Sequence, residues 1–174
     1  MAGITAISGC AQGIRLPETG ESAEYFVLGV PGGAVEARLS AEGISGADVQ
    51  VTRFEDALRG RAYGATVDLY WTAEEVKGTV GGSPVDLKVI QEGNVLRIRG
   101  LYAGRTGNFS IQPGKIEGTL GGCSYGMESQ MGGTYVGSMT CGGVPTRANL
   151  QLPPTLAMYY PAEIAAHLAV FLAR

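Results

Sequence analysis

Hydrophobic and polar residues alternate along most of the chain, in short runs that a turn dipeptide interrupts every six to ten residues. Alternation with a period of two is typical of a strand that has one buried and one solvated face. We therefore predict consecutive β-hairpins over residues 24–152, with little helix among them. The interrupting dipeptides are Pro31-Gly32, Gly81-Gly82, Glu92-Gly93, Pro113-Gly114, Gly121-Gly122 and Gly132-Gly133.

The turn positions predict which residues face one another across each hairpin. A turn at Gly81-Gly82 places Lys77 opposite Asp86. Further two-residue turns at Gly64-Ala65, Thr72-Ala73 and Glu92-Gly93 extend this pair into a lateral row of charges of mostly alternating sign. Such cross-strand pairs each contribute about 0.2–1 kcal/mol. The predicted row is Arg61, Asp68, Lys77, Asp86 and Arg99.

The opposite face of the predicted meander is apolar and stays in phase across the turns. A glycine recurs on this face at positions 60, 78, 100, 118 and 137. Glycine weakens a strand unless it permits sharp coiling or the close approach of another element. Closure into a barrel or a helix laid against the sheet would each explain these glycines. The apolar face comprises Val67, Leu69, Trp71, Val76, Val85, Leu87, Val89, Leu96, Ile98, Tyr102, Phe109, Ile111, Ile116, Leu120, Tyr125 and Met127.

One helix is predicted, after the strands. Pro161 suits a first helical position, and residues 162–173 follow without a helix breaker. An apolar stripe is formed by Ile164, Leu168, Phe171 and Leu172, and alanine dominates the remaining surface. We expect this helix to plug or cap the apolar face of the sheet. The predicted fold is thus mainly all-β: an antiparallel meander, strongly curled or closed into a barrel, with one C-terminal α-helix on its apolar face.

Composition agrees with an ordered domain and excludes several classes of protein. The chain has 174 residues, of which 28 are Gly, 45% are hydrophobic and 17% are charged, with a net charge of −3. A chain of this kind is neither disordered nor collagen-like, and its charge gives no reason to expect nucleic acid as a partner. The sequence contains no run of about 18 apolar residues, so it predicts no transmembrane helix. We divide it into an N-terminal arm (1–23), a meander (24–152) and a C-terminal linker and helix (153–174) of the same domain, with residues 41–47 as a connecting loop.

Groups for catalysis or metal binding are scarce. Ser124 lies in a G-x-S-x-G pattern, but strand-like alternation follows it where an α/β-hydrolase would have a helix. His167 is the only histidine and follows Glu163 by one helical turn, where we expect it on a solvated edge of the helix. A hydrolase built on Ser124 and His167 is therefore not favoured. No spacing typical of a zinc site is present, and we predict neither a metal nor a cofactor.

The three cysteines bear on covalent structure and on compartment. If the turn near Gly132-Gly133 keeps the faces in phase, Cys123 and Cys141 lie on neighbouring strands, close enough for a disulfide. In a reducing compartment the same two residues would be buried thiols. The segment Ile7-Ser8-Gly9-Cys10 is similar to the box that precedes a lipoprotein cysteine, but no basic or long apolar segment comes before it. A cytoplasmic location is the expectation.

Two functions remain after these exclusions. The first is a non-catalytic interaction or structural module that associates with itself or another protein through its edge strands. The second is a carrier that holds a lipid or another small apolar molecule inside a barrel or half-barrel. The side chains that would contact such a ligand are Trp71, Leu87, Ile98, Tyr102, Phe109, Tyr125 and Met127.

Overall fold

Fourteen antiparallel strands, each joined to the next by a short turn, make up most of the computed structural model, which describes residues 24–130 and 133–174. The predicted N-terminal arm and its lipoprotein-like segment lie outside the described residues. The strands are β1 Tyr25–Val30, β2 Gly33–Ser40, β3 Gly43–Gly46, β4 Val49–Arg53, β5 Ala57–Ala62, β6 Ala65–Trp71, β7 Glu75–Val80, β8 Ser83–Glu92, β9 Val95–Tyr102, β10 Arg105–Gln112, β11 Lys115–Leu120, β12 Cys123–Ser129, β13 Thr134–Cys141 and β14 Val144–Gln151.

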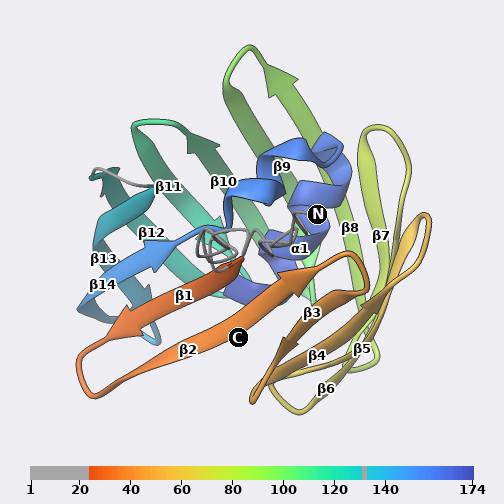
Figure 1. Ribbon diagram of the computed structural model, residues 1–174, viewed down its shortest axis with the longest axis horizontal. Coiled ribbons are helices and arrows are strands. Elements are labelled where there is room, and N and C mark those ends of the chain that lie inside the picture. The colour runs from red at the N-terminus through yellow and green to blue at the C-terminus, as the bar shows by residue number, and fades with distance from the viewer. Residues whose placement is uncertain (1–23, 131–132) are drawn as a thin grey trace, which may run out of the picture.

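The meander closes into a barrel (Figure 1). Every strand pairs with its neighbours in sequence, and β1 pairs with β14 to complete the ring. The strongly curled or closed sheet predicted from the sequence is therefore confirmed as a closed barrel. The segment predicted as a loop at 41–47 is instead largely strand β3, because Gly43 to Gly46 pair with β2.

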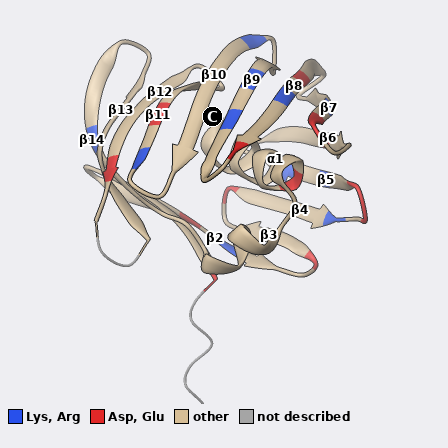
Figure 2. Cartoon of the chain, turned by 90° about the horizontal axis from the view of Figure 1, so that it is seen from above, with Lys and Arg blue, Asp and Glu red and all other residues tan. Residues whose placement is uncertain are grey.

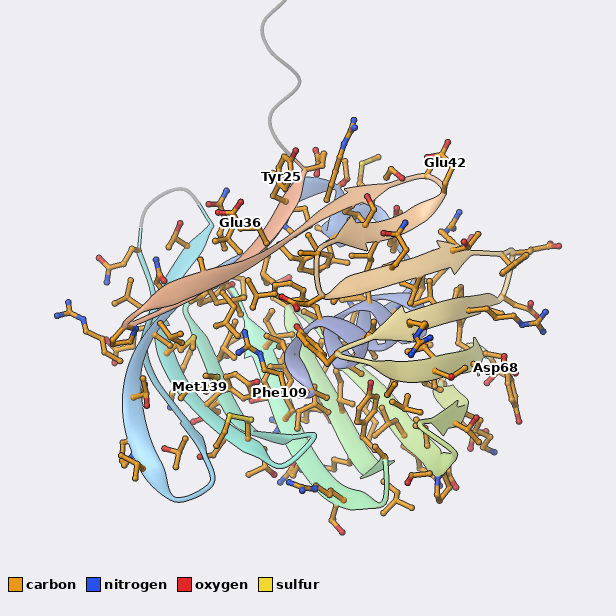
Figure 3. The ribbon with its side chains drawn as sticks, turned by 90° about the horizontal axis from the view of Figure 1, so that it is seen from below. Tyr25, Glu36, Glu42, Asp68, Phe109 and Met139 are labelled. Atoms are coloured by element: carbon orange, nitrogen blue, oxygen red, sulfur yellow. A yellow bond between two sulfur atoms is a disulfide. The ribbon has the colours of Figure 1, made fainter. Side chains whose placement is uncertain are left out.

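The predicted apolar face forms the inside of the barrel, and all of its members are buried. Side chains alternate between the interior and the outer surface along each strand, as a closed antiparallel sheet requires. Phe109 has no exposed surface and lies inside, whereas Asp68 and Glu42 lie on the outside (Figure 3).

Three hairpins turn at positions other than those predicted, and the predicted row of charges is consequently wrong. The turns fall at residues 63–64, 73–74 and 93–94, so each pairing is shifted by two residues and every side chain keeps its face. Of the predicted row, only the pair Lys77–Asp86 is present. Asp68 lies opposite Arg59, with Nε to Oδ1 at 3.1 Å, and Asp86 lies opposite Leu101.

The recurring glycines allow neighbouring strands to approach closely. At Gly100, where φ is +140°, a Cβ atom would lie 2.1 Å from the carbonyl oxygen of Asp86 on β8. A Cβ atom at Gly78 would lie 2.0 Å from the carbonyl oxygen of Asp68 on β6. Only a residue without a side chain fits such a position, so the glycines let the strands coil tightly against one another.

The α-helix α1 (Pro161–Leu172) runs through the interior of the barrel, preceded by a short 3-10 helix, η1 (Pro154–Met158) (Figure 1). The helix packs most closely on β5 to β9. Phe171 stacks on Phe26 of β1 with ring centroids 4.9 Å apart, so α1 also contacts the closing strand. The helix begins at Pro161 as predicted, but it is buried on nearly every side instead of along one stripe. No helix among the described residues is long and apolar enough to cross a membrane.

The two ends of the barrel are distinguished by the direction of α1. We call the end at which the helix begins the entry end; it carries the turns at 41–42, 54–56, 72–74, 93–94 and 113–114. At the opposite, exit end, the hydroxyl groups of two tyrosines donate to the last carbonyl groups of the helix. Tyr63 bonds to the carbonyl oxygen of Phe171, and Tyr125 to that of Leu172 at 2.6 Å. These bonds satisfy acceptors that a buried helix end would otherwise leave unpaired.

Candidate functional site

A buried polar cluster lies where α1 enters the barrel. It is formed by Arg53 at the end of β4, Trp71 at the end of β6, Tyr159 in the linker, and Glu163 and His167 on the helix. Strands β4 and β6 both end at this end of the barrel, and the linker crosses it before α1 begins. Residues far apart in the sequence are thereby brought together around the first turns of the helix.

Glu163 and Arg53 form an ion pair in which Nε of Arg53 donates to Oε1 of Glu163. The side chain of Glu163 is 2% exposed and that of Arg53 is 30% exposed. The carboxylate raises the pKa of Arg53, chiefly through this hydrogen bond. Because Glu163 stands in the first turn of α1, its charge also interacts favourably with the helix dipole. The pair thus places a buried negative charge at the helix start and gives it a partner that reaches solvent.

His167 lies one turn deeper, with no exposed surface. Its Nδ1 is 2.8 Å from the carbonyl oxygen of Glu163. A carbonyl oxygen only accepts, so Nδ1 carries the proton and the neutral ring leaves Nε2 as an acceptor. Nε2 is buried and has no hydrogen-bond partner among the described residues. The ring centroid of Tyr159 is 5.2 Å away and that of Trp71 6.4 Å away. The expectation that this histidine lies on a solvated edge is wrong.

Burial lowers the pKa of His167, and the positive charge of Arg53 lowers it further. The hydrogen bond to the carbonyl of Glu163 and the negative charge of its carboxylate raise the pKa; each effect is smaller than that of burial but larger than that of Arg53. Arg53 also lies over the ring of Tyr159, with Cζ 5.1 Å from the centroid. The ring of Tyr159 is therefore held between a guanidinium and an imidazole. The protonation state of the imidazole consequently affects the packing of the linker.

The structure does not bring Ser124 and His167 together. Ser124 lies between the buried residues Cys123 and Tyr125 on β12, so its side chain is on the outer face of the barrel wall, whereas His167 is inside. No group of three or more His, Cys, Asp or Glu side chains that could hold a metal ion occurs within residues 24–130 and 133–174.

The side chains predicted to contact an apolar ligand do line the interior, but α1 fills the space beside them. None of them is more than 8% exposed, and all of them belong to one core cluster with the buried residues of α1. Tyr125 bonds to the helix itself, and Trp71 lies next to His167. The residues concerned are Trp71, Leu87, Ile98, Tyr102, Phe109, Tyr125 and Met127.

Cys123 and Cys141 are joined by a disulfide (Figure 3). They are direct partners on β12 and β13, with Cα atoms 4.4 Å apart. The bond ties the exit-end termini of these two strands together, and Cys123 itself is buried.

Closure of the barrel leaves short free strand edges on β14 and on β2, where residues 33–36 have no partner on the side of β3. Strand β1 pairs with β14 through Val27, Leu28 and Gly29, and β14 then extends to Val144 past the end of β1. A groove of about 360 Å³ lies beside this seam. Pro145 stands on the extension and has no N–H to donate, a common means of blunting an edge. Association by edge pairing, as predicted from the sequence, would have these short edges as its templates, and Pro145 weakens the one on β14.

Arg53 and Tyr159 were not predicted as members of a site, because no spacing in the sequence relates β4 to the linker. One signal pointed to the burial of Glu163 and His167: residues 161–173 contain no Lys or Arg, and all of them except these two are apolar. A helix of that kind is typically buried all round. Comparison of the chain with protein-family models, with curated proteins and with solved structures finds no match.

Proposed function

We propose that this protein is a non-catalytic β-barrel module that works through contacts of its outer surface, with a second copy of itself as the first partner to be tested. The observation that carries this proposal is the distribution of apolar side chains. Helix α1 fills the interior, while Met158 and Tyr160, on either side of Tyr159, are 82% and 78% exposed. Large exposed apolar side chains that lie close together are typical of interaction surfaces.

We call Phe54, Met158 and Tyr160 the entry-end patch. Phe54 is 46% exposed and follows Arg53, whose side chain contacts Tyr159 and Glu163. Because Arg53 bridges the turn 54–56 and the linker, the exposed side chains next to it in both segments lie on the same end of the barrel. Aromatic residues and methionine are enriched at protein interfaces. Lys, Arg, Asp and Glu are distributed over the wall (Figure 2), and the net charge of −3 gives no support to a nucleic-acid partner.

The test is the mass of the protein in solution. Analytical ultracentrifugation over a range of concentrations should show self-association of the unmodified chain and a monomer for the double variant Met158→Ser/Tyr160→Ser. Val144→Ser is the matched control, because Val144 is 71% exposed and lies at the exit end. A monomer at every concentration, or equal loss of association in the control, would contradict self-association through this patch.

A carrier of a lipid or other apolar molecule is the second candidate function. It is supported by the apolar lining of the barrel, but a ligand could reach that lining only if α1 moved out. Native mass spectrometry of freshly purified protein distinguishes the two proposals. Lipid-sized adducts on a monomer would favour the carrier, and an oligomer without adducts would favour the interaction module.

The compartment remains a prediction from the sequence. A disulfide such as Cys123–Cys141 persists in oxidising compartments and is rare in the cytoplasm of most organisms. Trapping free thiols at the moment of cell lysis tests the expectation of a cytoplasmic location: reduced Cys123 and Cys141 would favour it, and a bridged pair would count against it.

A further inference from the structure

The neutral imidazole of His167 is built into the contact between the helix and the linker. Tyr159 packs on this ring, and the two exposed members of the linker, Met158 and Tyr160, flank Tyr159. The linker is also anchored by Leu156, which is buried in the core, and by polar contacts. One of these contacts is made by Thr155, which bonds to the carboxylate of Glu24 through its Oγ1 at 2.6 Å and its N–H at 3.3 Å.

A proton added to Nε2 would find no acceptor. The site is buried, and Nε2 has no partner in the part of the chain that the structure describes. Among the described residues, the carboxylate that acts on the ring is that of Glu163, and it is engaged by Arg53. Arg53 itself is positive and disfavours a second positive charge, although less strongly than the carboxylate of Glu163 favours it. An imidazolium here would thus be a buried cation with an unpaired donor, which is among the most unfavourable states of a protein interior.

Within residues 24–130 and 133–174, the other elements packed around the ring present neutral side chains to it. The linker contributes the neutral phenol of Tyr159, and β6 contributes the indole of Trp71. The remaining strands against which α1 packs present aliphatic side chains to the interior at this end of the barrel. These side chains are Leu58 of β5, Val76 of β7, Val89 of β8, and Leu96 and Ile98 of β9.

We propose that His167 is a proton-operated latch, and that protonation of its ring at mildly acidic pH releases the linker 152–160 and the first turns of α1 from the entry end. The barrel wall stays closed, because the strand pairs do not include this segment. The latch does not depend on the proposed function. Its consequence for association does rest on that function: because Met158 and Tyr160 belong to the released segment, acidification would change the entry-end patch.

The chain is well suited to a direct test, because Trp71 is its only tryptophan and His167 its only histidine. Tryptophan fluorescence should show a reversible change between pH 7.5 and pH 5, while the far-ultraviolet circular dichroism of the barrel stays constant. In the same range, the two ring C–H signals of this histidine in the proton NMR spectrum should titrate with the same midpoint. Limited proteolysis should cleave within residues 152–160 at the lower pH at least tenfold faster than at pH 7.5.

His167→Leu removes the titrating group and keeps an apolar side chain, and His167→Gln serves if the leucine variant does not fold. Both should abolish the fluorescence transition and the acid-dependent cleavage. The latch is overturned if the unmodified protein shows no fluorescence transition above pH 5, if the imidazole titrates with a different midpoint, or if a variant retains the transition. Loss of the far-ultraviolet signal in the same step would also overturn it, because the barrel itself would then be unfolding.

Measuring the solution mass at pH 7.5 and pH 5.5 separates the latch from the proposed function. A fluorescence transition with no change in mass upholds the latch and contradicts association through the entry-end patch. A change in mass without a fluorescence transition overturns the latch and leaves the association intact.

Discussion

Glu163, buried in the first turn of α1, is paired with Arg53, which stands at the end of β4 and keeps about a third of its side chain in solvent. The two partners therefore differ in what each loses when the other is removed. A buried carboxylate without a partner is costly, whereas a partly exposed guanidinium can turn to water.

This asymmetry predicts unequal effects of two substitutions. Arg53→Met should reduce the free energy of unfolding by about 3 kcal/mol, because it leaves the carboxylate of Glu163 buried without a partner. Glu163→Gln should reduce it by only about 1 kcal/mol. Urea unfolding of both variants and of the double variant provides the measurement. Equal losses in the two single variants would mean that Glu163 has access to solvent in the folded protein.

The stability of the protein should fall at mildly acidic pH because of His167. Its pKa in the folded protein lies below the ordinary value of about 6.5, so the unfolded chain takes up this proton first as the pH is lowered. Above the pKa of the unfolded chain, about 6.5, the neutral ring makes its full contribution to the free energy of unfolding. This contribution declines, by at most about 1.4 kcal/mol per pH unit, until the folded pKa is reached.

Urea unfolding at several pH values between 7.5 and 5 measures this decline, and carboxylates contribute a background that His167→Leu leaves in place. The difference between the two proteins should therefore grow as the pH falls. Parallel curves would show that the histidine titrates normally and is not sealed inside the barrel.

Substitution of Gly100 by alanine should destabilise the barrel by about 3 kcal/mol or more, because the new Cβ atom would collide with the backbone of β8. The control is Gly126→Ala, where the nearest atom to a Cβ is Oγ of Ser138 at 3.8 Å and the change should stay within about 0.5 kcal/mol. Thermal unfolding of the two variants makes the comparison. If Gly100→Ala unfolds at the temperature of the unmodified chain, the strands have room to separate at this position.

Tyr125→Phe should cost about 1–2 kcal/mol of unfolding free energy, since it leaves the carbonyl of Leu172 buried without a donor. Tyr70→Phe removes a hydroxyl from a side chain that is 49% exposed and should have no measurable effect. Chemical denaturation of the pair tests the difference, and a neutral Tyr125→Phe would indicate that water reaches the end of the helix.

The disulfide should account for about 3 kcal/mol of stability, as expected for a bond between cysteines 18 residues apart. Replacing Cys123 and Cys141 together by alanine should lower the melting temperature, and a reductant should lower it in the unmodified protein only. Thiol titration of the denatured protein should find one free thiol before reduction, that of Cys10, and three after it. Three free thiols before reduction would show that the bond does not form.

From β6 to β12, the side of the barrel to which the strand residues point could be predicted from the sequence, but the register of three hairpins could not. A shift of two residues preserves every inward-facing position, so the hydrophobic pattern does not distinguish the two registers. Only the residue preferences of the turns can then distinguish the registers, and they favoured the wrong turn position here. Tyr63 takes a positive φ of 51° ahead of Gly64, a conformation that non-glycine residues seldom adopt. The predicted charge row failed for the same reason.

The candidate site was harder to predict than the wall. Glu163 and His167 could be recognised as neighbours from their spacing of four residues, but their burial depends on the barrel closing around α1. The partner of Glu163 lies 110 residues away in the sequence. No local pattern identifies Arg53 among 13 basic residues, since its role follows only from where β4 ends in three dimensions.

Because α1 follows every strand in the chain, the barrel lining leaves the ribosome before the segment that will occupy it. The pairing of β1 with β14 likewise joins segments from opposite ends of the chain, which is typical of slow folding. A nascent chain interrupted before residue 161 would therefore expose the apolar side chains that line the barrel, and these could bind other hydrophobic molecules. During biosynthesis, synthesis of the 12 residues of α1 therefore competes with binding of the exposed lining by chaperones and with aggregation.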